Sequence, residues 1–423
     1  MKDTDLTEIE KTFLTLVKEA LHPAMAPTQN PLPTGEADKA ELFRLAEIHF
    51  VTPMVYEALS RRKDFAEWTT AERGKWRQAA LPSFVVQSKR TQSFLHLYQE
   101  MTDSGLALPL VVKGIILRNM YPNPDMRKSS DEDLLVRPVD FPALDAFLLA
   151  HGFQRPPFDT EETPFEVAYL RREDLLYLEV HTTLFSEKSE AYGHLNREFD
   201  RIHERATSYS IQGVEVKTPD DTDHFLYLLC HCYKHFLHGG FGIRQLCDVL
   251  VMTQTAQTRI DWQHIADRTT KLHMFILWRC FADIGEKFLG FEKKALPGLD
   301  LSRPLPDSTE LLSDTIAAGV YGKEGFGRIH SGNMVMAGLV QSRDQKSGKW
   351  RLVSSSLFPK AEYMKKSYAY ADKRPFLLPV AYVQRLGAYR KLRRKAKLQG
   401  GDDDSVTVAK KRIAMLEKYG MVE

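Results

Sequence analysis

Apolar positions recur at helical spacing through most of the first hundred residues. The pattern predicts helices over Leu6–Leu21, Leu42–Leu59 and Ala79–Met101. Four prolines within residues 22–38 predict a loop between the first two helices. We therefore expect a helical region over residues 1–104.

After residue 104 the pattern changes to short apolar runs and alternating positions. This predicts strands over 108–112, 133–136, 165–170, 177–183 and 209–217, and helices over 115–120, 141–151 and 192–205. Strands mixed with helices are typical of an α+β fold, so we expect a small mixed β-sheet over residues 105–217. Segments 131–136 and 176–183 should be neighbouring strands in it.

Helical spacing dominates again after Thr218, with Thr218 or Asp220 as the expected helix cap. The predicted helices cover 225–236, 244–253, 262–272 and 275–289 and would form a helical domain over 218–290. Segment 291–312 is rich in Pro, Leu and acidic residues and predicts a linker. It opens a last region, 291–423, that contains a densely basic stretch at 385–397.

Charge and cysteine content narrow the class of protein. The 423 residues include 58 Lys and Arg against 56 Asp and Glu, a net charge of +2, so a nucleic-acid or membrane role would need a local basic patch. The basic stretch could contact an anionic partner, although a solvated helix face is the favoured interpretation. Only four cysteines, no long apolar run and an acidic amino terminus predict a cytoplasmic protein without a transmembrane segment.

The sharpest candidate chemistry is the pair Asp131 and Asp133 at the start of a predicted strand. Alternation places both side chains on one face and Glu132 on the other, so Glu132→Gln should have little effect on activity. Paired carboxylates on one strand can bind two Mg²⁺ ions, the arrangement of two-metal phosphoryl transfer. Alternation also presents Glu179 as a third acid, and the alternative for Glu179 is a polar strand face in water.

The residues around this pair resemble a family. Segment 111–118 (VVKGIILR), Tyr121-Pro122-Asn123-Pro124, Arg127 and segment 130–136 (SDEDLLV) are similar to the signature of a bacterial nucleotidyltransferase family of the polymerase-β superfamily. Glu179-Val180-His181 stands where that family has its third carboxylate and a histidine, and segment 218–248 resembles its helical domain. The resemblance covers about residues 40–255.

The resemblance implies a Mg²⁺-dependent nucleotidyltransferase with Asp131, Asp133 and Glu179 as catalytic and metal-binding residues. It implies an NTP substrate, with ATP expected, and an acceptor hydroxyl on a small molecule, a protein or an RNA end. The implied nucleotide-binding residues are Lys113, Gly114, Arg127, Ser130, Lys234, His235 and Arg244. The sequence departs from the family pattern at two places. Lys113-Gly114 replaces the superfamily's Gly-Ser loop, although backbone amides at the start of the Gly114 helix could still bind phosphate. Glu179 stands where many members have Asp.

Two other hypotheses stay open. A catalytically silent nucleotide-binding or regulatory protein would keep the same fold. Four histidines share one helix face: His224, His231, His235 and His238. They could line the nucleotide or acceptor cleft, or they could be core or surface residues without a functional role. A further alternative is a Zn²⁺ site formed by His231, His235 and a cysteine. Arg244 and Asp248, four residues apart, could pair along their helix.

Overall fold

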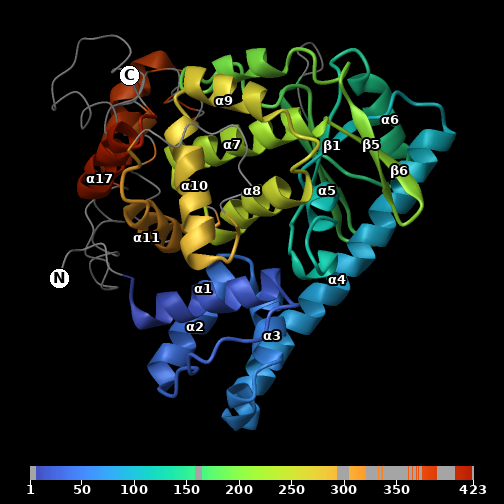
Figure 1. Cartoon of the computed structure of the whole chain (residues 1–423). Helices are drawn as coiled ribbons and strands as arrows, with labels where there is room; N and C mark the ends of the chain where they lie inside the picture. Colours follow the sequence, from blue (N-terminus) through green and yellow to red (C-terminus); the bar gives the residue numbers. More distant parts are fainter. Residues whose placement is uncertain are drawn as a thin grey trace.

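The computed structural model describes residues 6–157, 164–292, 304–320, 374–387 and 405–421, with single positions between 332 and 370. Its small mixed sheet and surrounding helices confirm the expected α+β class. In Figure 1 the sheet lies between the long helix α4 on one side and the stack of α7, α8 and α10 on the other, with the amino-terminal helices below.

The amino-terminal region is helical, as expected. Its elements are α1 (Glu8–Leu21), α2 (Glu36–Ile48), α3 (Thr52–Ser60), the short 3₁₀ helix η1 (Asp64–Glu67) and α4 (Thr70–Asp103). Capping boxes, Thr7 with Glu10 and Thr69 with Glu72, begin α1 and α4. The single helix expected over 42–59 is wrong, because the backbone of Phe50 adopts a φ of 57° and ends α2 there.

The four-stranded sheet has the order β1-β2-β4-β3. Its strands are β1 (Leu110–Val112), β2 (Glu132–Leu135), β3 (Glu166–Arg171) and β4 (Leu176–His181). Strands β2 and β4 are parallel neighbours, as expected for 131–136 and 176–183, and the outer pairs are antiparallel. Between the strands lie α5 (Gly114–Arg118), η2 (Pro124–Met126) and α6 (Phe141–Ala150).

Two expectations in the second half of this region are wrong. The single strand expected over 209–217 is a hairpin of β5 (Thr207–Ile211) and β6 (Val214–Thr218), because Gln212 and Gly213 take positive φ values of 50° and 85° and turn the chain. The helix expected over 192–205 is reduced to the 3₁₀ helix η3 (Gly193–Phe199).

The carboxy-terminal half is helical. Its elements are α7 (Asp221–His238), α8 (Ile243–Thr255), α9 (Trp262–Lys271), α10 (Phe275–Phe288), α11 (Thr309–Ala318), the 3₁₀ helix η5 (Pro375–Leu377) and α17 (Ser405–Lys418). Of the two expected caps, Asp220 begins α7 by accepting the Asp223 N–H at 2.8 Å. Helix α11 begins inside the expected linker 291–312, and residues 388–397 of the basic stretch lie outside the described residues.

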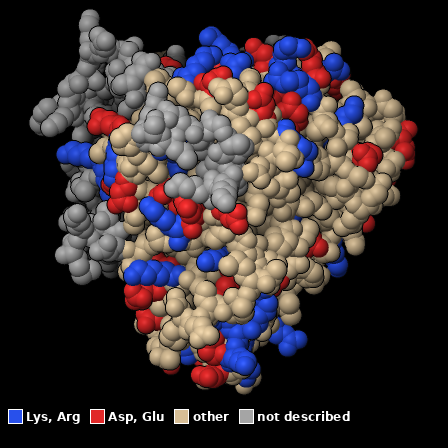
Figure 2. Space-filling model, in the orientation of Figure 1, with Lys and Arg blue, Asp and Glu red and all other residues tan. Residues whose placement is uncertain are grey.

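Most of the buried apolar side chains that the structure describes form one continuous cluster, which contains residues from α1 through to Met421 after α17. Met364 and Ala381 form a second, small cluster. His49 joins three elements within the main cluster: its Nδ1 accepts the Ile243 N–H at 3.1 Å and its Nε2 lies 3.1 Å from the Ile316 carbonyl oxygen. On the face in Figure 2, basic and acidic side chains lie interspersed. Among the helices that the structure describes, none has the length and apolar character to cross a membrane.

Candidate active site

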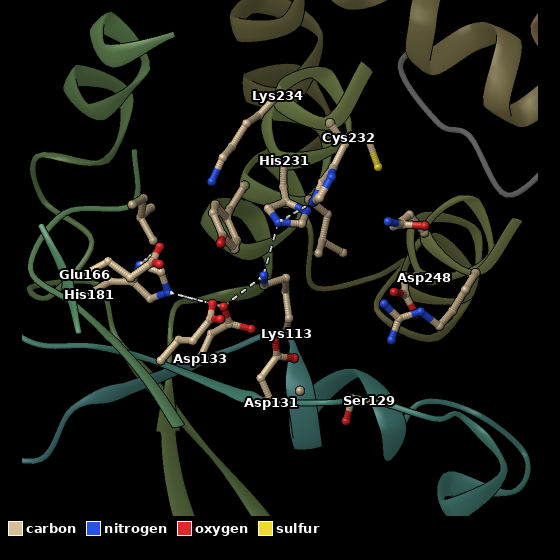
Figure 3. A pocket seen from close by; sticks show the side chains of 18 of the residues that line it. Lys113, Ser129, Asp131, Asp133, Glu166, His181, His231, Cys232, Lys234 and Asp248 are labelled. Atoms are coloured by element: carbon tan, nitrogen blue, oxygen red, sulfur yellow. Dashed lines mark hydrogen bonds and ion pairs between the residues drawn. The ribbon is translucent and has the colours of Figure 1, made fainter. Parts of the chain in front are cut away.

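The candidate site is a cavity of about 280 Å³ over one face of β2 and β4, with α7 and α8 on its other side. The parallel register pairs Asp133 with Glu179, so both carboxylates project from adjacent strands toward the same space. Asp131, which precedes β2, lines the same cavity. Figure 3 shows Asp131, Asp133 and His181 facing Lys234 and His231 of α7.

Asp133, Glu179 and His181 form the tightest group in this cavity. One ligand atom from each lies within 4.8 Å of the other two, and this is the one such group of three that the described residues contain. His181 Nε2 is 3.3 Å from Asp133 Oδ1 and 3.9 Å from Glu179 Oε2. Asp131 is outside the group, so the three expected carboxylates share one cavity but not one equally tight cluster.

The acids of this cavity repel one another. Burial, followed by the charges of Asp133 and Asp131, raises the pKa of Glu179 to about 8. Burial and the charge of Asp133 also raise the pKa of Asp131. Burial would raise the pKa of Asp133 too, but Lys113 and His181 outweigh it and lower that pKa well below its usual range. Glu179 and Asp131 therefore lack a sufficient positive partner, whereas Asp133 has one in Lys113.

Lys113 reaches this cluster from a strained turn between β1 and α5. Its Nζ is 3.0 Å from Asp133 Oδ1, and its backbone has a φ of 61°. Its N–H donates to Nε2 of buried His224 at 2.9 Å. Gly114 has to be glycine, because its φ is 39° and a Cβ atom there would lie 2.1 Å from Glu132 Oε2.

Glu132 lies under this turn. It faces away from Asp131 and Asp133, as expected, but it is buried. Its carboxylate accepts the Ile115 N–H at 2.7 Å and pairs with the buried guanidinium of Arg118 at 2.5 Å. Glu132→Gln would leave the buried Arg118 cation without its counter-charge, so we expect it to lower stability. The expectation of little effect on activity stays a prediction.

The turn at Lys113 and Gly114 has fewer backbone N–H groups available for phosphate than the sequence suggests. The expected contact was with backbone N–H groups at the start of the Gly114 helix. The N–H groups of Lys113 and Ile115 are already bound, to His224 and Glu132. Helix α5 has only five residues, so it is a weak source of helix-dipole attraction. The Lys113 side chain remains the group of this turn that projects toward the acids.

From its residue type, Arg127 is expected to bind a phosphate with two guanidinium nitrogens. In the structure, two of these nitrogens already bind an internal carboxylate. Arg127 Nε and Nη2 donate to Asp248 at 2.6 and 2.7 Å, and Tyr121 donates to the same carboxylate at 2.7 Å. Asp248 therefore pairs with Arg127, rather than with Arg244 as the spacing along α8 suggested. Arg127 Nη1 is buried without a hydrogen-bond partner, and the residue lines the cavity.

Helix α7 contributes Lys234, His231 and His235 to the cavity. His231 Nε2 lies 3.2 Å from Lys113 Nζ and 3.2 Å from His235 Nε2. Burial, followed by the charges of Lys113 and Lys234, lowers the pKa of His235 to about 3. Neither histidine belongs to a group of three metal-ligating side chains within the described residues, so the zinc hypothesis gains no support.

Of the remaining expected nucleotide residues, Arg244 lines the cavity and its Nη1 donates to the Lys128 carbonyl at 2.7 Å. Ser130 does not line it. Ser130 borders a separate small depression beside Gln87 and Arg90. Its neighbour Ser129 lines the cavity instead.

Sequence reasoning missed Glu166, which lines the cavity from β3. Alternation along β3 shows that Glu166 shares a face with Ala168 and Leu170. Only the antiparallel register, which pairs Glu166 with His181, brings it to the acids. Tyr227 and Gln245 were also missed, because their roles depend on how α7 and α8 pack over the sheet.

Comparisons with known proteins agree with this geometry. The model of a family described as uncharacterised nucleotidyltransferases matches residues 35–289, which is more than half of the chain. That span includes the sheet, the cavity and α7 to α10. The searches of curated proteins and of solved structures found no match. The chain therefore belongs to this nucleotidyltransferase family.

Proposed function

We propose that this protein transfers a nucleoside monophosphate from an NTP, with ATP as the expected donor, to a hydroxyl group of an acceptor. The proposal places two Mg²⁺-type cations at Asp131, Asp133 and Glu179. The observation that carries it is the convergence of these three acids from two adjacent parallel strands into one cavity, with Lys113 among them.

The donor set fits a divalent cation. Carboxylate oxygens of Asp133 and Glu179 and a nitrogen of His181 lie within 4.8 Å of one another. The raised pKa of Glu179, about 8, reflects buried negative charges that a cation would stabilise. Cations bound there would supply Lewis-acid stabilisation of the charge that develops on the transferred phosphoryl group.

The chain's own cations suit the triphosphate. Lys113, Lys234 and Arg244 line the cavity, and Arg127 adds its unpartnered Nη1. In the proposed reaction the acceptor oxygen bonds to the α-phosphorus and the bond from that phosphorus to the β-phosphate oxygen breaks. Pyrophosphate leaves with the bonding electrons, and the hydroxyl proton passes to a carboxylate of the cavity. The acceptor can be a small molecule, a protein side chain or an RNA end.

One observation favours the silent nucleotide-binding alternative. The cations expected to hold the triphosphate already have internal partners, Lys113 with Asp133 and Arg127 with Asp248. A protein that only binds a nucleotide could keep such pairs, whereas a transferase has to open the pair at Asp133 when it binds a cation.

The test is to incubate the purified protein with each NTP, Mg²⁺ or Mn²⁺ and a panel of acceptors. Pyrophosphate release and a nucleotide-monophosphate mass increment on an acceptor, or on the protein itself, are the readouts. Asp133→Asn should lose at least about 100-fold of the turnover, because several kcal/mol of transition-state stabilisation depend on the bound cations. The exposed Asp103→Asn is the matched control and should keep full turnover. Nucleotide binding without transfer to any acceptor would support the silent alternative.

A further inference from the structure

The imidazole of His181 ends β4 on the same face as the acids. It is buried, with 5% of its surface exposed, and its Nε2 points to the gap between Asp133 and Glu179. The Phe165 ring packs edge-on against it at 5.8 Å between centroids. The ring is therefore held in one position by the fold.

The other ring nitrogen faces a different acid. His181 Nδ1 is buried, has no hydrogen-bond partner and lies 3.5 Å from Glu166 Oε2, across the antiparallel pair of β3 and β4. A carboxylate at this nitrogen can accept a proton from Nδ1, and in that tautomer the Nε2 lone pair is directed at the cluster. This is the arrangement by which a carboxylate outside a metal site orients a histidine ligand.

Two roles for Nε2 compete. It could carry a proton and donate to Asp133, as a purely structural group would. It could instead coordinate a cation together with Asp133 and Glu179. The convergence of Nε2 with oxygens of Asp133 and Glu179 within 4.8 Å favours coordination, because a cation bound by the two acids would lie where Nε2 points. The proton of the imidazole would then be on Nδ1, beside Glu166.

We propose that His181 Nε2 is a ligand of the divalent cation and that Glu166 is the positioning residue for its ring. This inference rests on the proposed function, since it names a ligand and an ion preference for the same metal site. Mg²⁺ prefers oxygen ligands, whereas imidazole suits transition metals. The centre should therefore favour a first-row transition ion over Mg²⁺, and Mn²⁺ is the probe of that class.

The experiment loads the full-length, metal-free protein with Mn²⁺ and records electron spin echo modulation, which detects a ¹⁴N nucleus bonded to the ion. Wild type should show nitrogen modulation. His181→Asn should lose it and bind Mn²⁺ about 10- to 100-fold more weakly, with a smaller loss of Mg²⁺ affinity. Glu166→Gln should keep the modulation and weaken Mn²⁺ binding less.

Controls separate this ring from other histidines. His151→Ala, outside the cavity, should match wild type in both modulation and affinity. Circular dichroism and urea denaturation in EDTA verify that each variant folds. If the modulation instead disappears in His231→Ala, the nitrogen belongs to α7 and the inference is wrong. Mn²⁺ binding to wild type without nitrogen modulation would overturn the inference alone, whereas absence of any Mn²⁺ or Mg²⁺ binding would overturn the proposed function with it.

Discussion

Replacing Glu179 by Gln should stabilise the protein without metal and destabilise it relative to wild type with metal. In the folded protein burial and neighbouring acids raise the Glu179 pKa to about 8, against 4.5 for an ordinary Glu. At pH 7 the folded carboxyl keeps a proton that the unfolded chain releases. At about 1.4 kcal/mol per pH unit over the 2.5 units between pH 4.5 and pH 7, this destabilisation of the folded protein has an upper limit of about 3.5 kcal/mol.

The expected gain is smaller than this limit. The Glu179 side chain is 26% exposed, and solvent screens part of the repulsion. The Gln side chain also brings a polar amide into the same place. We therefore expect Glu179→Gln to raise the free energy of unfolding in EDTA at pH 7 by about 1–2 kcal/mol.

A bound cation should reverse the order. Wild type gains about 2.7 kcal/mol from a cation at 100 times its dissociation constant, and the variant gains less because it has lost a charged ligand. Urea denaturation at pH 7, in EDTA and in Mn²⁺, measures both effects. Exposed Glu173→Gln, in the turn between β3 and β4, is the matched control and should follow wild type in both media. The reasoning is refuted if Glu179→Gln unfolds at lower urea than wild type in EDTA, or if Mn²⁺ stabilises both proteins equally.

Three further changes test the surroundings of the site. Glu132→Gln should lower the free energy of unfolding by about 3 kcal/mol in urea denaturation, because it leaves the Arg118 guanidinium buried without a counter-charge; an unchanged midpoint would contradict this. Burial lowers the pKa of His49 to about 3, so between pH 6.5 and 5 the unfolded chain binds a proton that the folded protein does not bind. Over this range the free energy of unfolding should fall by about 2 kcal/mol more in wild type than in His49→Asn. Parallel curves of unfolding free energy against pH would contradict this prediction. Arg127→Lys breaks the two-bond contact with Asp248 and should reduce both stability, by about 2 kcal/mol, and NTP affinity measured by calorimetry, whereas unchanged NTP affinity would rule out a role for Nη1.

Local patterns predicted the parts of this fold that depend on nearby residues. Alternation along β4 correctly placed Glu179 on the face of the strand away from the buried Leu178 and Val180. Alternation along β2 likewise placed Glu132 and Asp133 on different faces of the sheet. The failures at Phe50 and at the β5–β6 hairpin are also local, but they depend on single residues with positive φ that no apolar pattern marks.

The contacts that shape the site connect distant parts of the chain, and the sequence carried no signal for them. Arg127 and Asp248 are 121 positions apart, and the N–H of Lys113 meets a histidine 111 positions later. Residue type correctly suggested that Arg127 would seek a bidentate anion, but an internal carboxylate satisfies that preference as well as a phosphate does. Only the packing of α7 and α8 over the sheet decides between them.

The pair of Lys113 and Asp133 links cation binding to nucleotide binding. At 3.0 Å the ammonium neutralises a carboxylate that a cation needs, so a cation entering without nucleotide has to displace it. A triphosphate would offer the ammonium another anionic partner. Lys113→Met should therefore bind Mn²⁺ several-fold more tightly without nucleotide and bind NTP more weakly, opposite changes that calorimetry measures separately. Exposed Lys89→Met is the control for loss of one positive charge. If both affinities fall in Lys113→Met, the lysine holds the acids in place, and the exchange between carboxylate and phosphate does not occur.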